Sequence, residues 1–265
     1  MEWNGKVCVV TGASSGIGKQ TALDLAEAGA TVCCVARRTA ELDAIVRSLP
    51  GSGHTAFRAD VTDRSAMEAL AQHVDSTYGR CDVLVNNAGF SRGREFQGIE
   101  SLEDIDAVME TNFFGVVNCT SYLLDLLERS APSNVVNVAS VAGRFSFGNA
   151  SAYCASKFAV VGWSESIRID LASRGVSVSL VEPGPIPTEG FTQEALVDHP
   201  VLRFALGSTS GVSAAIRDAV EGDKPQRVTP RWYYLLQIPK VVAPRLFRLG
   251  AAKVASPRVP KERKR

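Results

Sequence analysis

Two side chains suited to proton transfer are spaced one helical turn apart in the segment YCASK. Tyr153 and Lys157 are separated by four residues, which places both on one face of a helix. A free tyrosine has a pKa of about 10, poorly matched to neutral pH. A neighbouring ammonium and the positive charge of an oxidised nicotinamide would both favour tyrosinate and lower that pKa. The pair predicts an acid/base for hydride transfer between a carbonyl and an alcohol, although alone it is more often a surface contact.

Two further polar residues suit the same reaction. Ser140 follows the apolar run Val135–Ala139, and at the end of a strand it can hydrogen-bond a substrate oxygen beside Tyr153. Asn112, in METNFFG, can anchor a water that links Lys157 to solvent. The set predicts a catalytic group of four.

A glycine-rich turn near the N-terminus is the first candidate cofactor site. TGASSGIG (11–18) follows an apolar run and opens a helical pattern, so its glycines permit close backbone approach and the helix N-terminus offers N–H groups to a pyrophosphate. Many strand-to-helix turns need glycine for steric reasons alone, and only the context favours a cofactor. The candidate contacts are Gly12, Ser14, Ser15, Gly16, Ile17 and Gly18.

The residues after the second apolar run favour one cofactor over another. Arg37 and Arg38 occupy the position where an NAD site usually has an acid, and the first acid is Glu41. Guanidinium groups bind a 2′-phosphate well, so the sequence predicts NADP(H). A solvated basic turn and an NAD-preferring alcohol dehydrogenase are the alternatives.

Two more strand ends carry candidate cofactor contacts. Asp60 and Val61 would meet the adenine amine and ring. Asn87, Ala88 and Gly89, within NNAG (86–89), end another run, where side-chain amides can tie neighbouring strands together.

These residues all follow or precede apolar runs that alternate with helical patterns. Strands are predicted at 6–11, 31–36, 55–60, 83–85, 135–139 and 176–182, with helices at 16–28, 40–49, 64–78, 102–117 and 152–173. Near-continuous apolar strands alternating with helices indicate a parallel sheet covered on both faces. We therefore expect an α/β, doubly wound fold with its ligand crevice at the carboxyl ends of the strands.

Taken together, the motifs resemble the short-chain dehydrogenase/reductase superfamily in its compact single-domain form. The matching segments, over residues 5–190, are TGASSGIG (11–18), DV (60–61), NNAG (86–89), Asn112, Ser140, YCASK (153–157) and PGPIPT (183–188). The segment after Thr188 is modest in size and the C-terminal tail is unusual for the family.

The resemblance implies a Rossmann-like sheet of about seven strands and a catalytic tetrad of Asn112, Ser140, Tyr153 and Lys157. It also implies that Tyr153 and Lys157 contact the cofactor, with Lys157 on the nicotinamide ribose. By the same resemblance, the carboxamide is positioned by Pro183, Gly184, Ile186 and Thr188. A homo-oligomer, dimer or tetramer, is implied as well. The complete tetrad argues against a non-catalytic dinucleotide-sensing regulatory protein.

Residues around the serine and after the sixth run predict the substrate class. Candidate substrate contacts are Ser140, Phe145, Phe147 and Phe191, with Phe90, Val141, Cys154 and Leu196 nearby and Arg144 as a polar exception. Their apolar character predicts a lipophilic acyl, steroid-like or retinoid-like substrate; the alternative is that they pack the loop.

Charge is divided unevenly along the 265 residues, although the net charge is only +1. Residues 224–265 contain 12 Lys and Arg and one acid, Glu262, whereas the preceding residues contain 17 basic and 27 acidic residues. We predict a catalytic domain over 1–225, including a substrate loop at 185–212, and a basic extension over 226–265 that contains prolines and aromatic residues.

The extension mixes apolar clusters with basic residues, and Arg245–Val254 is a candidate short amphipathic helix. This composition suits an anionic membrane surface, so residues 228–265 are a candidate peripheral membrane contact. A lid over the pocket and a subunit contact are the alternatives. Nucleic-acid binding is disfavoured because no recognition module accompanies the charge.

Cysteine usage and the N-terminus bear on the cellular compartment. The six cysteines form no CxxC pair and no metal-ligand spacing with the three histidines, which predicts reduced thiols and no metal site. MEWNGKVCVVTG lacks the basic and apolar regions of a signal peptide, and no run of about 18 apolar residues occurs. A cytoplasmic protein is expected, and peripheral membrane association through the basic C-terminal tail is the alternative.

Overall fold

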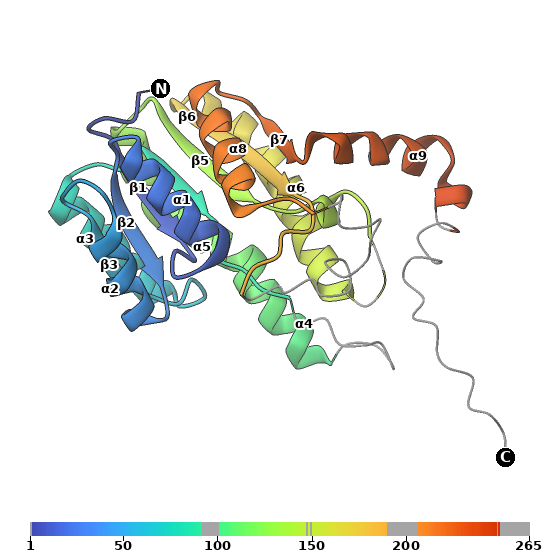
Figure 1. Cartoon of the computed structure of the whole chain (residues 1–265), viewed down its shortest axis with the longest axis horizontal. Helices are drawn as coiled ribbons and strands as arrows, with labels where there is room; N and C mark the ends of the chain where they lie inside the picture. The colour runs from blue at the N-terminus through green and yellow to red at the C-terminus, as the bar shows by residue number, and fades with distance from the viewer. Residues whose placement is uncertain are drawn as a thin grey trace, which may run out of the picture.

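Seven parallel strands form the central sheet of this computed structural model, which describes residues 2–91, 101–146, 148, 150–189, 206–247 and 249 (Figure 1). The strands are β1 (Val7–Thr11), β2 (Thr31–Ala36), β3 (Thr55–Arg58), β4 (Val83–Asn86), β5 (Ser133–Val138), β6 (Val176–Pro183) and β7 (Gln226–Thr229). Their order is β3-β2-β1-β4-β5-β6-β7, and every neighbouring pair is parallel. The order reverses between β1 and β4, which is where doubly wound sheets bind ligands.

Helices cover both faces of this sheet. They are α1 (Gly16–Glu27), α2 (Thr39–Ser48), α3 (Arg64–Tyr78), α4 (Leu102–Met109), α5 (Gly115–Arg129), α6 (Ser151–Ala172), α8 (Thr209–Glu221) and α9 (Gln237–Val242). One apolar core joins α1, α2 and α8 to one face, and two others join α3, α5 and α6 to the opposite face. The α/β, doubly wound, Rossmann-like prediction is confirmed.

The strands form where apolar runs allow burial on both faces. Every residue of β1, β4 and β5 is buried, as a parallel sheet between two helical layers requires. The six strands expected from the sequence are all present, each within two residues of its expected ends. All six cysteines are free and buried, as predicted for reduced thiols.

Three elements differ from the sequence-based expectation. The helix expected at 102–117 continues to Arg129, and a π-helical turn, η1 (Glu110–Phe114), separates α4 from α5. Helix α8 and strand β7 had no expected counterpart. Strand β7 pairs with β6 directly beyond residue 225, so the sheet continues into the stretch assigned to the extension.

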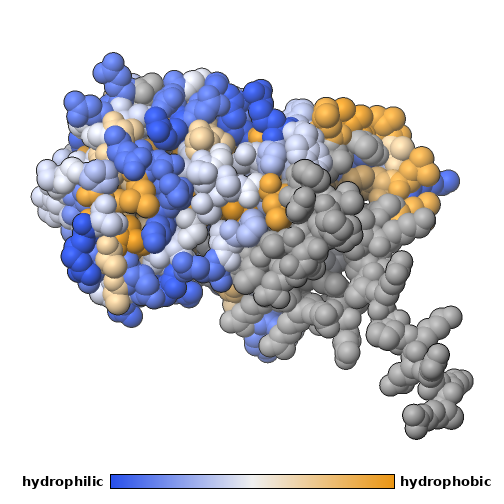
Figure 2. Space-filling view, in the orientation of Figure 1, coloured by the Kyte–Doolittle hydropathy of each residue, from blue (hydrophilic) through white to orange (hydrophobic). Residues whose placement is uncertain are grey.

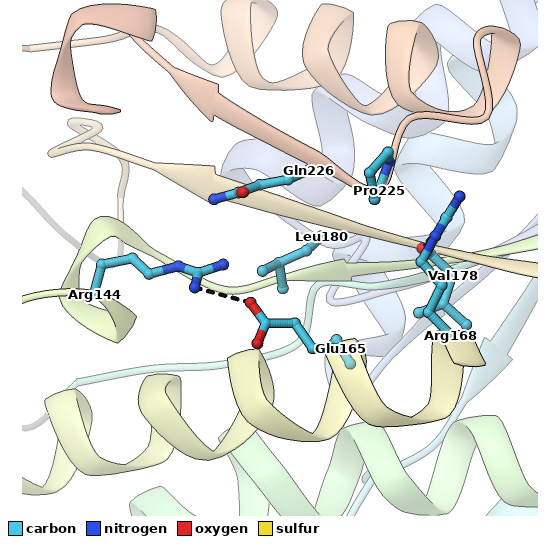
Figure 3. A pocket seen from close by; sticks show the side chains of 8 residues that line it. Arg144, Glu165, Arg168, Val178, Leu180, Pro225 and Gln226 are labelled. Atoms are coloured by element: carbon cyan, nitrogen blue, oxygen red, sulfur yellow. Dashed lines mark hydrogen bonds and ion pairs between the residues drawn. The ribbon is translucent and has the colours of Figure 1, made fainter. Parts of the chain in front are cut away.

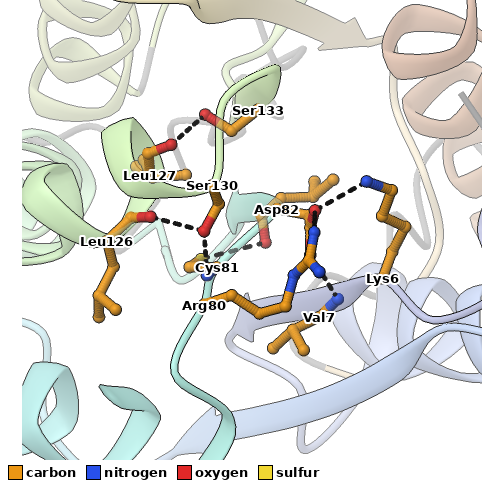
Figure 4. Close-up of polar contacts among 10 residues, drawn as sticks. Lys6, Val7, Arg80, Cys81, Asp82, Leu126, Leu127, Ser130 and Ser133 are labelled. Carbon is orange, nitrogen blue, oxygen red and sulfur yellow. Dashed lines mark hydrogen bonds and ion pairs between the residues drawn. The ribbon is translucent and has the colours of Figure 1, made fainter.

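A buried carboxylate joins β1 to β4 at the end of the sheet remote from the glycine turn (Figure 4). Asp82 accepts hydrogen bonds from Arg80 Nε and Nη2, at 2.8 and 2.6 Å, and from the Val7 amide and Lys6 Nζ, both at 2.9 Å. Burial by itself would raise the pKa of Asp82, but these hydrogen bonds hold it below the ordinary value of 3.8. The ionised carboxylate therefore stabilises the fold above its ordinary pKa, and protonation in acid removes that contribution.

Replacing Asp82 with asparagine should lower the free energy of unfolding at pH 7 by about 3 kcal/mol. The figure is the low end for breaking a buried ion pair, because Lys6 and Arg80 partly reach solvent. Urea denaturation at pH 7 and pH 3 measures it, and the deficit should shrink at pH 3, because protonation of this carboxyl in the unfolded chain then removes part of the stability that the ionised carboxylate provides. Asp125→Asn, at an exposed position on α5, is the matched control. An equal deficit at both pH values would contradict the assignment.

Candidate active site

The glycines of the first turn leave a cradle at the N-terminus of α1. A Cβ on Gly12 would lie 2.9 Å from the Cα of Ala88, and one on Gly18 would lie 2.3 Å from the Gly12 carbonyl oxygen. Gly12 and Gly16 adopt φ values of +65° and +55°, which side chains disfavour. Because α1 begins at Gly16, its first N–H groups face this space. Ile17 packs partly buried against the core beneath. The cradle fits a dinucleotide pyrophosphate.

Thr11 and Asn87 connect the ends of β1 and β4 beside the cradle. The hydroxyl of Thr11 donates to the Val85 carbonyl at 3.3 Å and accepts from the amides of Asn87 and Ala88 at 3.0 and 3.1 Å. The Asn87 side-chain amide donates to the Thr11 carbonyl at 3.0 Å. These contacts fix the crevice at the point where the strand order reverses.

The neighbouring asparagine ties strands together, as expected of NNAG. Asn86 Nδ2 donates to Asn137 Oδ1 on β5 at 2.9 Å and to the Thr120 hydroxyl on α5 at 3.0 Å. Both amides are buried, so their mutual hydrogen bonds offset the loss of water. The ends of β4 and β5 are therefore held in register beneath the site.

Arg38 lies over the glycine turn. Its guanidinium donates to the hydroxyl of Ser15 at 2.8 Å and to that of Ser14 at 3.1 Å. The side chain remains about half exposed, and Glu41 approaches it at 3.6 Å. A half-exposed positive charge thus stands beside the cradle.

Arg37 and Asp60 lie on the neighbouring strand ends. Arg37 Nη1 approaches Asp60 Oδ2 at 3.4 Å, while Asp60 Oδ1 accepts from the amide and hydroxyl of Thr62 at 3.1 and 2.9 Å. Burial tends to raise the pKa of Asp60, but the Thr62 hydrogen bonds and Arg37 leave it below the ordinary value. Val61 packs closely on Gly115 of α5. Asp60 is thus an ionised acceptor at the edge where adenine would lie.

The π-helical turn presents Asn112 to the site. The Asn112 side chain accepts from the Phe90 amide and donates to the Phe90 carbonyl, both at 2.9 Å, and donates to the Ser156 hydroxyl at 3.1 Å. A Cβ on Gly89 would lie 3.0 Å from Asn112 Oδ1 and 3.7 Å from Lys157 Nζ. The NNAG turn, η1 and α6 therefore meet at one point. Single π-helical turns inside longer helices often occur at functional sites.

Lys157 is buried with its ammonium held in place. Its Nζ donates to the carbonyl of Val138 at 2.9 Å and lies 5.8 Å from the centre of the Tyr153 ring. Burial lowers the pKa of Lys157 to about 8. The amine therefore stays mostly protonated at neutral pH, and it can exchange a proton near that pH.

Tyr153 and Ser140 face each other across the site. A hydrogen bond from the Ser140 side chain lowers the pKa of Tyr153, but burial raises it by more, so the net direction is upward. Removing the phenol from water therefore has a larger effect on this pKa than the hydrogen bond, so without a cofactor the net direction is opposite to the lowering expected from Lys157 and an oxidised nicotinamide together. Ser140 Oγ also donates to the Pro183 carbonyl at 3.3 Å and accepts from the Ala142 amide at 3.1 Å. These bonds hold the Ser140 oxygen beside Tyr153, and its single proton can turn to the Pro183 carbonyl or to the phenol.

The turn after β6 closes over the glycine cradle. A Cβ on Gly16 would lie 3.2 Å from the Thr188 side chain, so this turn lies directly above the first helix. Gly184 donates its amide to the Thr229 carbonyl at 2.8 Å, and Ile186 is buried in the core. Of the four predicted residues of this turn, Thr188 lies beside the glycine cradle and Pro183 contacts Ser140, whereas Gly184 is covered by Tyr233 and Ile186 packs in the core.

The apolar wall beside Ser140 includes part of the tail. Val141, Val228 and Tyr233 form a buried cluster against which Phe145 packs. The ring of Tyr233 covers Gly184, where a Cβ would lie 2.7 Å from it. Of the other predicted substrate residues, Phe147, Phe191 and Leu196 lie outside the described residues.

Arg144 turns away from this wall into a separate cavity (Figure 3). Its guanidinium contacts Glu165 on α6 at 2.9 Å and the buried Glu182 on β6 at 2.6 Å. Burial raises the pKa of Glu182, and Arg144 holds it down in part. The cavity, of about 100 Å³, is lined by Arg144, Ser164, Glu165, Arg168, Val178, Leu180, Pro225 and Gln226. Ser164 lies two helical turns beyond Lys157, so this cavity is distinct from the crevice.

Several supporting residues were not anticipated. Thr11 lies in the quoted glycine motif, but nothing in its pattern indicated that one hydroxyl serves two amides. Ser156 lies between the paired residues of YCASK and reaches back to Asn112. The carbonyl of Val138 that holds Lys157 is a backbone group and leaves no signal in sequence. Tyr233 was anticipated only as part of a possible lid.

Comparison with known proteins gives one consistent answer. A family model described as short chain dehydrogenase matches residues 6–196. A 3-oxoacyl-(acyl-carrier-protein) reductase of Thermotoga maritima is 39% identical over 214 residues, covering 77% of this chain and 86% of the relative. A farnesol dehydrogenase of Aedes aegypti is 36% identical over 195 residues, covering 71% and 80%.

Solved structures agree with these sequence relatives. A short chain dehydrogenase from Burkholderia cenocepacia in complex with NADP superposes with a TM-score of 0.80 at 25% identity, covering 97% of this chain and 100% of the other. A short chain dehydrogenase/reductase from Burkholderia phymatum in complex with NAD gives 0.78 at 26% identity, covering 98% and 99%. The neighbours thus include complexes with both cofactors.

Proposed function

Because the chain belongs to the short-chain dehydrogenase family, whose members are oxidoreductases that bind a nicotinamide dinucleotide, we propose that it uses NADP(H) to interconvert a lipophilic carbonyl and a secondary alcohol. The observation that carries the proposal is the meeting of Asn112, Ser140, Tyr153 and Lys157 beside the glycine cradle. It supports a proton-transfer centre where the reacting carbon would lie.

The bound nicotinamide supplies or accepts the hydride. In the reducing direction, Tyr153 donates its phenolic proton to the oxygen of the substrate, where negative charge develops. Ser140 donates its single hydroxyl proton to the same oxygen after turning it away from the Pro183 carbonyl, while the Ala142 amide keeps the Ser140 oxygen in place. In the oxidising direction the same groups act in reverse, and Tyr153 accepts the proton.

Lys157 stabilises the tyrosinate left after proton transfer. Its ammonium lies on the same face of α6 and is fixed by the Val138 carbonyl, so its charge stays beside the phenol. Because burial raises the pKa of Tyr153, the positive charges of the site must compensate for that burial during the reaction. Asn112 is anchored through Phe90 and Ser156, and we infer that it holds a water that links Lys157 to solvent.

Arg38 supports NADP(H) over NAD(H). Its guanidinium is already placed by the hydroxyls of Ser14 and Ser15, so little further ordering is needed to bind a phosphate there. Arg37 is directed partly toward Asp60 and contributes long-range positive charge. Between the end of β2 and Glu41 the chain has no acidic residue that could accept a hydrogen bond from an unmodified ribose.

The apolar wall supports a lipophilic substrate. Val141, Phe145 and Tyr233 lie next to Ser140 and offer carbon surface to the part of the substrate beyond the carbonyl. Burial raises the pKa of Tyr233 to about 12, so it presents a neutral ring. Two relatives are named as a 3-oxoacyl-(acyl-carrier-protein) reductase and a farnesol dehydrogenase, and both names agree with this proposal.

We also propose that the chain forms a homo-oligomer, a dimer or a tetramer, as family members commonly do. Two of its long helices carry exposed apolar side chains, Tyr122 on α5 and Phe158 and Ile169 on α6. Pairing of these helices between copies would cover that surface.

Replacing Tyr153 with phenylalanine should reduce turnover by at least about a thousandfold, because general acid–base catalysis and oxygen orientation are both lost. NADPH binding, followed by fluorescence titration, should survive. Tyr122→Phe, at an exposed position on α5, is the control and should keep full activity. Undiminished turnover in Tyr153→Phe would refute the assigned mechanism, whereas a wild-type protein that binds NADPH without any turnover would support the non-catalytic dinucleotide sensor instead.

Replacing Arg38 with alanine should raise the KM for NADPH roughly tenfold to a hundredfold, the effect of losing a charge-assisted phosphate contact. The KM for NADH should change little. Arg47→Ala removes the same charge from an exposed position on α2 and serves as the matched control. Equal increases for both cofactors would show that Arg38 supports the turn rather than a phosphate.

Steady-state NADPH oxidation should separate the substrate classes. We expect kcat/KM for 3-oxoacyl thioesters or steroid ketones to exceed that for sugars by about a hundredfold or more, since burial of several methylenes favours the former. A preference for sugars would exclude the lipophilic assignment while leaving the reaction itself intact.

A further inference from the structure

Exposed apolar side chains are concentrated near the C-terminus. Eight of the 13 large apolar side chains that are exposed in the described part of the chain lie within residues 231–249. We call residues 231–247 together with Leu249 the C-terminal platform. The eight side chains are Trp232, Tyr234, Leu235, Ile238, Val241, Val242, Leu246 and Leu249. Figure 2 shows this apolar surface at the end of the molecule that carries α9.

The platform is docked on the catalytic domain along one side. Tyr233 packs on Gly184, Lys240 donates a hydrogen bond to the Arg144 carbonyl, and the ring of Phe247 lies 6.1 Å from that of Phe145. The three docking residues come from three consecutive parts of the platform: the 3-10 helix at Arg231–Leu236, helix α9 and the short helical stretch after residue 243. The eight apolar side chains thus face outward from an anchored surface.

The charges of this region have one sign. From Lys224 onward the chain contains 12 basic residues and one acid, Glu262. Arg231 and Arg245 are exposed on the platform itself. Aromatic and branched apolar side chains bordered by bases, without acids, form the composition that partitions into the headgroup region of an anionic bilayer.

We propose that the C-terminal platform docks the protein onto a bilayer that contains anionic lipids. Apolar side chains such as Val241 and Val242, 78% and 77% exposed, insert at the boundary between headgroups and acyl chains. Arg231 and Arg245 pair with lipid phosphates above them. Among the described residues no helix is both long and apolar enough to cross a bilayer, so the attachment is at the surface.

Docking would also bring the active site to the membrane. Tyr233 and Phe247 connect the platform to Gly184 and Phe145, which border the apolar wall beside Ser140. A lipophilic substrate dissolved in the bilayer would then meet the site without crossing water. This last step rests on the proposed function, whereas the docking itself does not.

Vesicle co-sedimentation of the full-length protein tests the docking. Phosphatidylcholine vesicles that contain phosphatidylglycerol should bind the protein about tenfold or more tightly than phosphatidylcholine alone, and high salt should remove the difference. The double variant Val241→Asp, Val242→Asp should bind about tenfold or more weakly. Arg245→Glu should weaken only the binding that depends on phosphatidylglycerol.

The matched control is Leu102→Asp. Leu102 is 74% exposed in the first turn of α4, outside the platform, and an aspartate there suits the positive end of the helix dipole. It should bind vesicles like the wild type. NADPH-linked turnover of the double variant in solution should persist, which would show that the variant is folded. Vesicle binding is measured independently of turnover, so a failure of the membrane proposal can be distinguished from a failure of the proposed enzymatic function.

Three results would overturn the proposal. The first is that the wild type binds neither kind of vesicle. The second is that the double variant binds vesicles as tightly as the wild type. The third is that, at low salt, the wild type binds vesicles with and without phosphatidylglycerol equally well. If vesicles are not bound and the double variant dissociates an oligomer in light scattering, the platform is a contact between copies of this chain.

Discussion

The hydroxyl of Thr11 is the contact on which the geometry of the crevice depends. It holds the amides that follow β4 while it remains part of β1, at the one place in the sheet where neighbouring strands lead away in opposite directions. The missing side chains of Gly12 and Gly18 let the two strand ends approach this closely. The four catalytic side chains are then positioned at the same edge, because they come from η1, from the turn after β5 and from the N-terminal part of α6.

Most of the fold was readable from burial patterns, and the exceptions have physical causes. The apolar strands and the paired positions on α6 follow directly from side-chain periodicity. The π-helical turn at Asn112 does not, because one extra residue in a turn leaves the apolar pattern of the surrounding helix almost unchanged. Strand β7, QRVT, escaped because it is a short edge strand with only Val228 buried.

The candidate site divides along similar lines. Residue types indicated the groups that could do chemistry, and the structure brings Asn112, Ser140, Tyr153 and Lys157 together. The direction of the Tyr153 pKa could not be read from spacing, since it depends on how much water surrounds the phenol. The same holds for Arg38: its charge was evident, but its orientation is set by two serine hydroxyls. Burial and orientation are properties of the folded chain.

The ring of Tyr233 on Gly184 has a consequence for the order of biosynthesis. The chain is made from its N-terminus, so the glycine cradle, the tetrad and six strands emerge from the ribosome before this ring exists. Strand β7, which completes the edge of the sheet, emerges only just ahead of it. A nascent chain can therefore contain the whole reaction centre and still lack the wall beside it. The site becomes complete only after residue 233 has been translated and has room to fold back.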